Sequence, residues 1–440
     1  MSDKERLELA HWVIKYAQQR GAHEIAVSIS DNRSVEVDFR DKKIDKLQES
    51  TESALSLSLY IDHRYSAHST SDIKKQSLAP FIEKTIAMTK YLAPDPYREL
   101  PDKKLYEGRQ ELDLEVFDAA YNEISPEKRI QLVKEVEAAA SSKSPKILSV
   151  TAGYYDGIYE FTKVHSNGFE GNRESTSFSL GASVTISDQD DRRPEDWFFI
   201  STRHLHQFIS PEEIGQRAAK RALAKMGMRK VGTQRSTMIV ENRAAGRLIS
   251  ALFQPLSGAA LQQKKSCFDS MLNQQIASPA FTVIDDPFVK RGMGSRLFDG
   301  EGISARIMPV IQQGILKNYF IDTYYARKLK VEPTFGAFSN LVFESGTRSQ
   351  DEIVKSVDKG ILVTTFLGGN SNSTTGDFSF GLQGFLIENG TLSFPVNEMN
   401  ISGNIKTLWK GLVEVGNDPY PYSSVRIPTL RFDDIQFSGS

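Results

Sequence analysis

Hydrophobic and polar positions alternate with two different periods in the first part of the chain. Apolar residues recur at helical spacing from Leu7 to Ala17, after Ser2 and Glu5, whose spacing is that of a capping box. Between residues 24 and 61 the period changes to two, which is typical of half-buried strands. The pattern therefore predicts one helix followed by several strands.

A second amphipathic stretch, over roughly 72–92, predicts another helix, so residues 1–95 are expected to form an α+β unit. The next segment, 93–104, contains three prolines and has no periodic apolar positions. Because proline removes a backbone donor and limits φ, this segment is expected to be an extended connector.

The following region is predicted to be a strand meander between two helices. Ser125 precedes a proline in the first helical turn, and Ser210 has the capping-box spacing to Glu213, so each marks the start of a helix. Residues 146–209 alternate in the manner of antiparallel strands. Two dipeptides mark its expected turns: Asp156-Gly157 and Asn167-Gly168.

Beyond about residue 230 the chain changes character and becomes strand-like and rich in glycine. Only two helices are expected there, near 242–257 and 351–358. Hairpins are expected around Gln313-Gly314 and Asn389-Gly390. We therefore predict an N-terminal region over 1–230, with its connector near 93–104, and a mostly β domain over 231–440.

Composition and charge exclude several classes of protein. Of 440 residues, 54 are Lys or Arg and 56 are Asp or Glu, so the net charge of -2 argues against a strongly basic nucleic-acid binder. No apolar run is long enough for a signal peptide or a membrane span. With a single cysteine, no disulfide framework is possible. A cytoplasmic protein that contacts neither membrane nor nucleic acid is expected.

The histidines restrict where a metal centre can lie. All seven occur at or before His206, so the C-terminal half cannot build a histidine-based site alone. His204 and His206 would share one face of a strand, a geometry that metal ligands use, but no third His or Cys is near. Surface histidines are the favoured interpretation, as they are for His63 and His68.

Three further candidate sites also have simpler structural explanations. Cys267 follows Lys264 and Lys265, which would lower a thiol pKa, but no histidine base lies in its half of the chain. The Asp285-Asp286 and Asp299–Glu301 clusters match no calcium loop, so turn formation is the favoured role.

The stretch from Leu367 to Gly384 is crowded with glycines and small polar residues. It has no lysine after the glycines and is therefore no phosphate-binding P-loop. It suits a backbone that approaches a ligand closely and equally suits a long polar loop. No nucleophile elbow is present, so residue chemistry alone assembles no complete catalytic set.

The order of several segments resembles the TldD/PmbA family, also called the modulators of DNA gyrase, and its PmbA (TldE) branch in particular. The matching segments include YIDHRYSAHSTSD, SPEEIGQRAAKRALAKMG, IDDPFVKRGMGSRLFDGEGISAR, TGDFSFGLQGFLIENGTLSFPVNEMNISGNI and VGNDPY. Together they extend over almost the whole chain.

This resemblance implies a two-domain α+β fold, with an α/β N-terminal region and a mostly β C-terminal domain. It also implies proteolysis of peptides or unfolded chains by a heterodimer of TldD with TldE. In the TldD branch, a helix-borne His-Glu-x-x-x-His and a C-terminal Cys bind zinc, and the Glu acts as general base.

The sequence departs from this motif at every position. Ile249 and Gln254 stand where the histidines would be, Ser250 stands at the Glu position, and Ile427 or a neighbour stands at the Cys position. A chain with these residues is expected to hold no metal, so that zinc is expected only in a TldD-type partner.

The main hypothesis is therefore a metal-free TldE/PmbA-like subunit that pairs with a zinc-bearing TldD-type subunit and forms a possible homodimer in isolation. Asn370, Thr375, Gly376 and Asp377 would bind an extended peptide substrate by strand addition. One alternative is a non-proteolytic regulatory protein of the gyrase-modulator type. Another is an independent hydrolase with an activated Ser or Thr.

Overall fold

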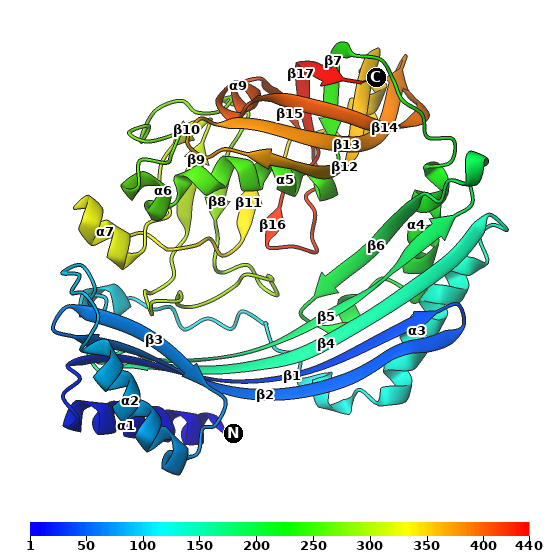
Figure 1. Cartoon of the computed structure of the whole chain (residues 1–440). Helices are drawn as coiled ribbons and strands as arrows, with labels where there is room; N and C mark the ends of the chain where they lie inside the picture. The colour runs from blue at the N-terminus through cyan, green and yellow to red at the C-terminus, as the bar shows by residue number, and fades with distance from the viewer. Residues whose placement is uncertain (440) are drawn as a thin grey trace.

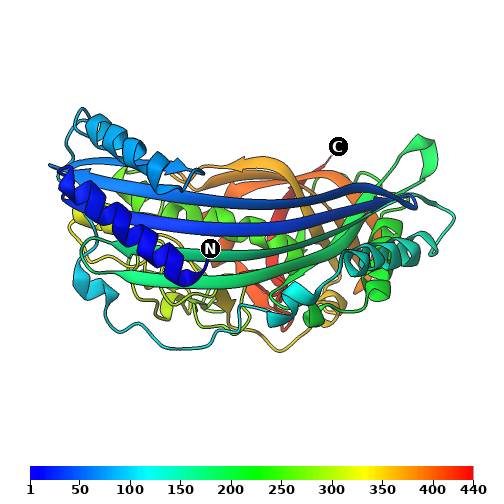
Figure 2. The ribbon, with the colours of Figure 1, turned by 90° about the horizontal axis from the view of Figure 1, so that it is seen from below.

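The computed structural model describes residues 1–439 and consists of two parts. A long, curved sheet forms the first part, and the C-terminal part lies against the concave face of that sheet (Figure 1). The helices of the first part lie on the opposite, convex face, so the sheet separates them from the C-terminal part (Figure 2).

The long sheet is antiparallel and has the strand order β3-β2-β1-β4-β5-β6. Its central strands are long enough to connect both ends of the molecule (Figure 1). The strands are β1 (Glu24–Arg40), β2 (Lys43–Ile61), β3 (Arg64–Thr70), β4 (Ile147–His165), β5 (Glu170–Ile186) and β6 (Glu195–Thr202).

Two helix pairs cover the convex face, one at each end. Helices α1 (Asp3–Gln19) and α2 (Lys75–Thr89) pack on the apolar positions near Val27, while α3 (Pro126–Ser141) and α4 (Pro211–Ala224) pack on those near Val37. Because side chains of a strand alternate between the two faces, β1 buries every second residue beneath one pair or the other. The predicted period of two thus has its cause in two hydrophobic cores that share one sheet.

One expected turn is wrong. Asp156-Gly157 lies in the middle of β4, where the fully buried Asp156 carboxylate accepts hydrogen bonds from Arg129 Nε at 2.6 Å and from the Tyr154 hydroxyl at 2.7 Å. An aspartate that usually signals a turn is here the buried partner of an arginine on α3. The other expected turn, at Asn167-Gly168, does join β4 to β5.

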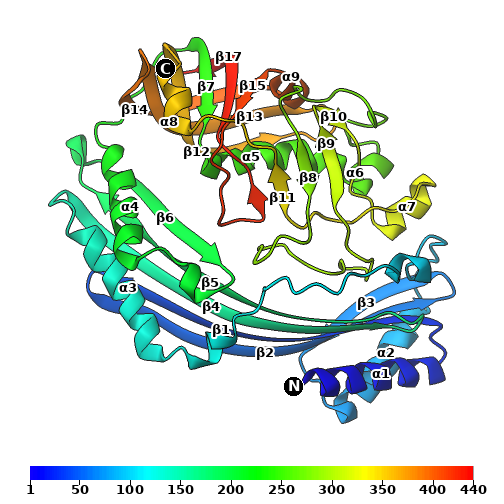
Figure 3. The same ribbon diagram turned by 180° about the vertical axis from the view of Figure 1, so that it is seen from behind.

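The connector after α2 is extended, as the prolines predict, and includes only short 3₁₀ turns, η1 (Lys103–Tyr106) and η2 (Ala119–Glu123), before α3. It passes between the sheet and the C-terminal part (Figure 3). Arg327 donates to the carbonyls of Tyr97, Glu99 and Leu100, and the amide of Ser304 donates to Leu105. The connector therefore joins the two parts through main-chain hydrogen bonds.

The C-terminal part contains two sheets with a shared apolar core that includes the buried Trp409. One has the order β10-β9-β8-β11-β16, and the other, β14-β13-β12-β7-β17-β15, closes on itself through a β14–β17 pairing. The strands are β7 (Gln234–Val240), β8 (Val283–Asp285), β9 (Met308–Gln312), β10 (Ile315–Leu316), β11 (Leu341–Phe343), β12 (Lys359–Ser371), β13 (Asp377–Glu388), β14 (Thr391–Asn404), β15 (Leu412–Val415), β16 (Val425–Arg426) and β17 (Leu430–Ser438).

The helices of this part are more numerous than the sequence predicts. The two expected helices are present as α5 (Asn242–Phe253) and α8 (Gln350–Lys355). Three further short helices, which the sequence does not predict, are present: α6 (Gly258–Gln262), α7 (Thr323–Leu329) and α9 (Ile405–Lys410). Both expected hairpins are present, at Gln313-Gly314 and Asn389-Gly390. None of the helices in residues 1–439 is both long and apolar enough to cross a bilayer.

His165, at the end of β4, is buried beside the connector and the C-terminal part. One of its ring nitrogens, Nδ1, lies 2.9 Å from the hydroxyl of Tyr106, and its ring packs against Phe169. Burial, together with the nearby Lys163 ammonium, lowers the pKa of His165 to about 3. The imidazole therefore stays neutral in the folded protein at pH values at which a free histidine is protonated.

This pKa difference predicts a loss of stability in acid. Below pH of about 6.5 the unfolded chain binds a proton that folded His165 does not, so its contribution to stability is complete above that pH and declines toward pH 3. The slope is about 1.4 kcal/mol per pH unit, or about 3 kcal/mol by pH 4.5. In urea unfolding at several pH values, His165→Gln should lose this component. Equal slopes for the variant and the parent would contradict the assignment.

Candidate functional site

Helix α5 begins directly after β7 and has two distinct faces. Its inner face, with Leu248 and Ile249, packs into the core of the C-terminal part. Its outer face carries Arg243, Arg247 and Ser250. In Figure 1, α5 crosses the middle of the C-terminal part, next to β12. Asp196 and Trp197 of β6 line the same cavity as Arg243, Arg247 and Ser250, so the outer face of α5 borders the long sheet at β6.

The four positions predicted to replace a zinc site do not form a set of metal donors. Ile249 and Ile427 are 2% and 1% exposed, and both belong to the large hydrophobic core of the C-terminal part. Ser250 is exposed, and its hydroxyl donates to the carbonyl of Gly246 at 3.0 Å. Gln254 is exposed at the end of the helix. Two aliphatic side chains offer no ligand atom, so these residues do not fit zinc.

The glycine-rich stretch is a β-hairpin rather than a long loop. β12 and β13 pair up to Ser371 and Phe378, and the chain turns between these residues. β7 pairs with β12 only as far as Val363, because α5 starts where β7 would continue. From Thr364 onward, β12 therefore has a strand neighbour on one edge alone, and its other edge lies beside α5.

Three of the four predicted peptide-binding residues gather at the tip of this hairpin. The amide of Asn404 donates to the carbonyl of Thr375 at 2.9 Å and to the carboxylate of Asp377 at 3.0 Å. Gly376 has a φ of 87°, which favours glycine. Asn370 adjoins the tip as the penultimate residue of β12, where it pairs with Ser379. The tip residues are thus used in part to hold the hairpin to β14.

Two adjoining cavities, of about 530 and 360 Å³, lie where β6, α4 and α5 meet, and we call them together the α5 groove. Asp196, Arg221, Arg243 and Thr364 line both cavities. The larger cavity continues over α4 and the loop at Tyr420. The smaller one follows the outer face of α5 and the free edge of β12. The groove therefore contains Ser250 and one strand edge without a strand neighbour.

An ion-pair network forms the base of the α5 groove. Arg221 donates two hydrogen bonds to Glu241, at 2.7 and 3.0 Å, and the nearly buried Asp196 lies 3.2 Å from Lys225 Nζ and 3.5 Å from Arg221 Nε. Burial by itself lowers the pKa of the Arg221 guanidinium, but the Glu241 carboxylate outweighs this effect and raises it. The network joins the long sheet and α4 to the residue that precedes α5.

Side chains also occupy the outer edge of β6, the last strand of the long sheet. The carbonyl of Glu195 accepts from Lys225 at 2.8 Å, that of Trp197 from Arg243 at 3.0 Å, and that of Phe199 from the Tyr420 hydroxyl at 3.2 Å. Because three alternate carbonyls are already bonded, β6 is a poor template for another strand. In the groove, the edge of β12 beyond Val363 is thus the edge at which a further strand could pair.

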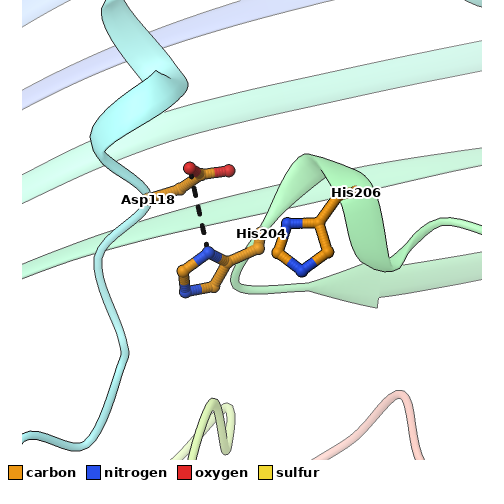
Figure 4. Close-up of side chains that lie close together, drawn as sticks. All are labelled: Asp118, His204 and His206. Atoms are coloured by element: carbon orange, nitrogen blue, oxygen red, sulfur yellow. Dashed lines mark ion pairs between the residues drawn. The ribbon is translucent and has the colours of Figure 1, made fainter.

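His204 and His206 do not lie on a strand, contrary to the prediction, because β6 ends at Thr202 and Leu205–Gln207 form a 3₁₀ turn, η4. Together with Asp118 they form the only group of three or more His, Cys, Asp or Glu residues in 1–439 whose ligand atoms all lie within 4.8 Å of one another (Figure 4). His204 Nε2 lies 2.8 Å from the carbonyl of Glu115, and Arg291 Nη1 lies 3.2 Å from His206 Nε2. The positive charge of the Arg291 guanidinium beside His206 disfavours a metal cation at this place. The cluster instead holds the connector to the sheet.

The other candidates from the sequence, Cys267 and the two acidic clusters, have contacts that fit structural roles. Burial raises the pKa of the Cys267 thiol, the opposite of the activation that neighbouring lysines would give. Asp299 accepts from the amides of Glu301 and Ile303 at 2.8 and 2.9 Å, which confirms its role in a turn. Asp285 is instead buried in β8, where its carboxylate accepts from the amide and hydroxyl of Ser339.

The basic character of the α5 groove is not predicted above. A signal was present, since Arg243 and Arg247 are spaced by one helical turn on an amphipathic helix. No local pattern indicates that Trp197 and Lys220 also line the groove, because they lie on β6 and α4 in the other part of the protein.

Known proteins share both the fold and this arrangement of parts. Three family models match in succession: PmbA/TldA metallopeptidase domain 1 over residues 26–89, the central domain over 120–226 and the C-terminal domain over 233–439. The chain belongs to the PmbA/TldD metallopeptidase-like family. The metalloprotease PmbA of Escherichia coli O157:H7 is 28% identical over 417 residues, which cover 94% of this chain and 92% of that protein.

Solved structures agree with this assignment. A Bacteroides thetaiotaomicron protein described as a candidate modulator of DNA gyrase is 42% identical, with a TM-score of 0.97 and complete coverage of both chains. TldE from Thermococcus kodakarensis has a TM-score of 0.86 and covers 98% of this chain and 100% of its own. At 21% identity, the second likeness concerns the fold alone.

The ion-pair network predicts a large effect of a single amide. Asp196→Asn would leave Arg221 and Lys225 without their shared carboxylate, and loss of one partner of a buried pair costs about 3 kcal/mol. Urea unfolding should show this loss. The matched control is Glu213→Gln, which breaks the exposed pair with Arg217 and should change stability by less than about 0.5 kcal/mol. Equal effects of the two changes would refute the prediction.

Proposed function

We propose that this chain is the metal-free PmbA/TldE-type subunit of a two-subunit peptidase whose zinc is carried by a TldD-type partner. The observation that carries the proposal is the composition of α5 and its surroundings. Ile249 and Ile427 are core residues, and Ser250 stands at the general-base position with a hydroxyl that is bonded within its own helix. Such a set supplies neither ligands for zinc nor a base for water.

The role of this chain would be to hold the peptide. The free edge of β12 beyond Val363 offers main-chain groups for strand addition, and the α5 groove lies beside that edge. The hairpin tip with Thr375, Gly376 and Asp377 ends the same strand pair. Peptide that pairs with β12 would be positioned by this subunit and cut by the partner.

The alternative is a regulatory protein without a part in proteolysis. The description of the Bacteroides relative as a candidate gyrase modulator favours it. With a net charge of -2, this chain would act through protein contacts rather than through DNA. The two proposals differ in whether a TldD-type partner gains or changes activity on mixing.

The first test is metal content and peptide cleavage. The purified chain should contain far less than one equivalent of zinc by mass spectrometry and should cleave no peptide alone. Mixed with the TldD-type protein of the same organism, it should form a complex by size-exclusion chromatography, and cleavage should exceed that of the partner alone. Stoichiometric zinc with activity in the lone chain would refute the proposal, and failure to associate would favour the regulatory alternative.

The second test concerns the hairpin. Asn370→Ala/Asp377→Ala should lower kcat/KM of the reconstituted complex about tenfold, or about 1.4 kcal/mol, which is the size of one or two hydrogen bonds. Asn404→Ala is the matched control, because it removes the bonds that hold the tip to β14 while keeping both predicted peptide-binding side chains. Unchanged cleavage by the double variant would show that these side chains do not bind peptide, and an equal loss in the control would show that the position of the tip, rather than direct contact by the two side chains, accounts for the effect.

A further inference from the structure

The α5 groove has an excess of positive charge in a chain that is slightly acidic overall. Two carboxylates line it, those of Asp196 and Glu241. The basic residues that line it are Arg217, Lys220, Arg221, Arg243 and Arg247. The groove is therefore positive although the molecule is not, and a low-dielectric cleft of one sign concentrates ligands of the opposite sign.

Both carboxylates of the groove are already neutralised by their neighbours. Glu241 accepts two hydrogen bonds from Arg221, and Asp196 lies within 3.5 Å of Arg221 and Lys225. Consequently Lys220, Arg243 and Arg247 have no carboxylate of the groove to pair with. Arg247 donates instead to the carbonyl of Gly369 at 2.8 Å.

Among the basic residues that line the groove, Arg243 has the most buried hydrogen-bond donors without a partner. Its guanidinium lines both cavities and lies over the ring of Trp197 at 4.4 Å, but only Nη2 is bonded, to the carbonyl of Trp197. Its Nε and Nη1 atoms are shielded from solvent and have no hydrogen-bond partner. Burial lowers the pKa of this guanidinium. The second hydrogen of Nη2 lies parallel to a hydrogen of Nη1 or to that of Nε, and such a two-donor edge matches a carboxylate, which accepts two parallel hydrogen bonds.

Neighbouring features suit the rest of a peptide. The Trp197 side chain is 47% exposed beside Arg243 and presents an aromatic surface. The free edge of β12 at Thr364–Phe366 lines the same cavity. Charge, aromatic surface and strand edge thus lie along one groove.

We propose that the α5 groove binds the carboxylate of an extended peptide, with Arg243 and Lys220 as its basic partners and Trp197 beside the adjoining residue. The carboxylate belongs either to an Asp or Glu side chain or to the C-terminus of the peptide. The inference rests on the proposed function in that it names the chemistry of the peptide this subunit holds.

The experiment measures binding to the isolated full-length chain by fluorescence anisotropy, without cleavage. The probes are dye-labelled ten-residue peptides of alternating Val and Thr that carry one central Glu, or Gln in its place, each with a free or an amidated C-terminus. We expect at least one carboxylate-bearing peptide to bind at least tenfold more tightly than the amidated Gln peptide. An advantage confined to the free C-terminus, or to Glu, identifies the source of the carboxylate.

Variants locate the effect. Arg243→Gln should abolish the tenfold preference, Arg243→Lys should keep part of it, and Lys220→Gln, at an exposed position, should reduce it about threefold. Lys4→Gln is the control for loss of one charge, since Lys4 is 86% exposed on α1, at the convex face. Thermal unfolding of each variant shows whether the fold is kept.

Several outcomes would overturn the inference. These are equal affinity for all four peptides, absence of binding, and a preference that survives Arg243→Gln or is lost in Lys4→Gln. Failure of the proposed function is distinguishable: a chain that prefers carboxylates but does not support cleavage by a TldD-type protein leaves this site standing and removes the peptidase role. Supported cleavage without carboxylate preference does the reverse.

Discussion

The relation between the two parts of the molecule depends on the buried ion pairs around Asp196. Removal of charges from water is unfavourable, so Asp196, Arg221 and Lys225 are tolerated only together and in a fixed geometry. Glu241, the N-cap residue of α5, extends the network to that helix. The orientation of α5 relative to β6 follows from these contacts, and so do the width and the charge of the groove between them.

Helix α5 meets different requirements on its two faces. The inner face of α5 keeps the packing that any helix at this place requires, with Ile249 and Ile427 in one core. Its outer face is free of that requirement, and there arginines and a serine stand where the family's TldD branch is expected to carry acid–base and metal chemistry. The two faces are under separate physical constraints because only one of them contributes to the core.

Much of the fold is predictable from local patterns, whereas the groove is not. The period-two run before Ile61 and the proline-flanked helix starts at Ser125 and Ser210 arise from burial and capping within a few residues, and the structure confirms them. The turn predicted at Asp156 is wrong because the partner of this carboxylate, Arg129, lies on another element. The same reason hid the groove, whose charges come from β6, α4 and α5. Local sequence carries no sign of which distant side chains will neutralise a given carboxylate.

The strand order of the long sheet has a consequence for how the chain is synthesised. β1 lies in the interior of the sheet, but one of its two neighbours is β4, so residues as far apart as Ala26 and His165 must pair. Until β4 has left the ribosome, β1 presents an open edge next to a complete β2–β3 meander. Pairings over such separations form slowly because a long loop must close first. The nascent chain therefore passes through an interval in which its future central strand is an edge open to aggregation, and this is the stage at which a chaperone would be most effective.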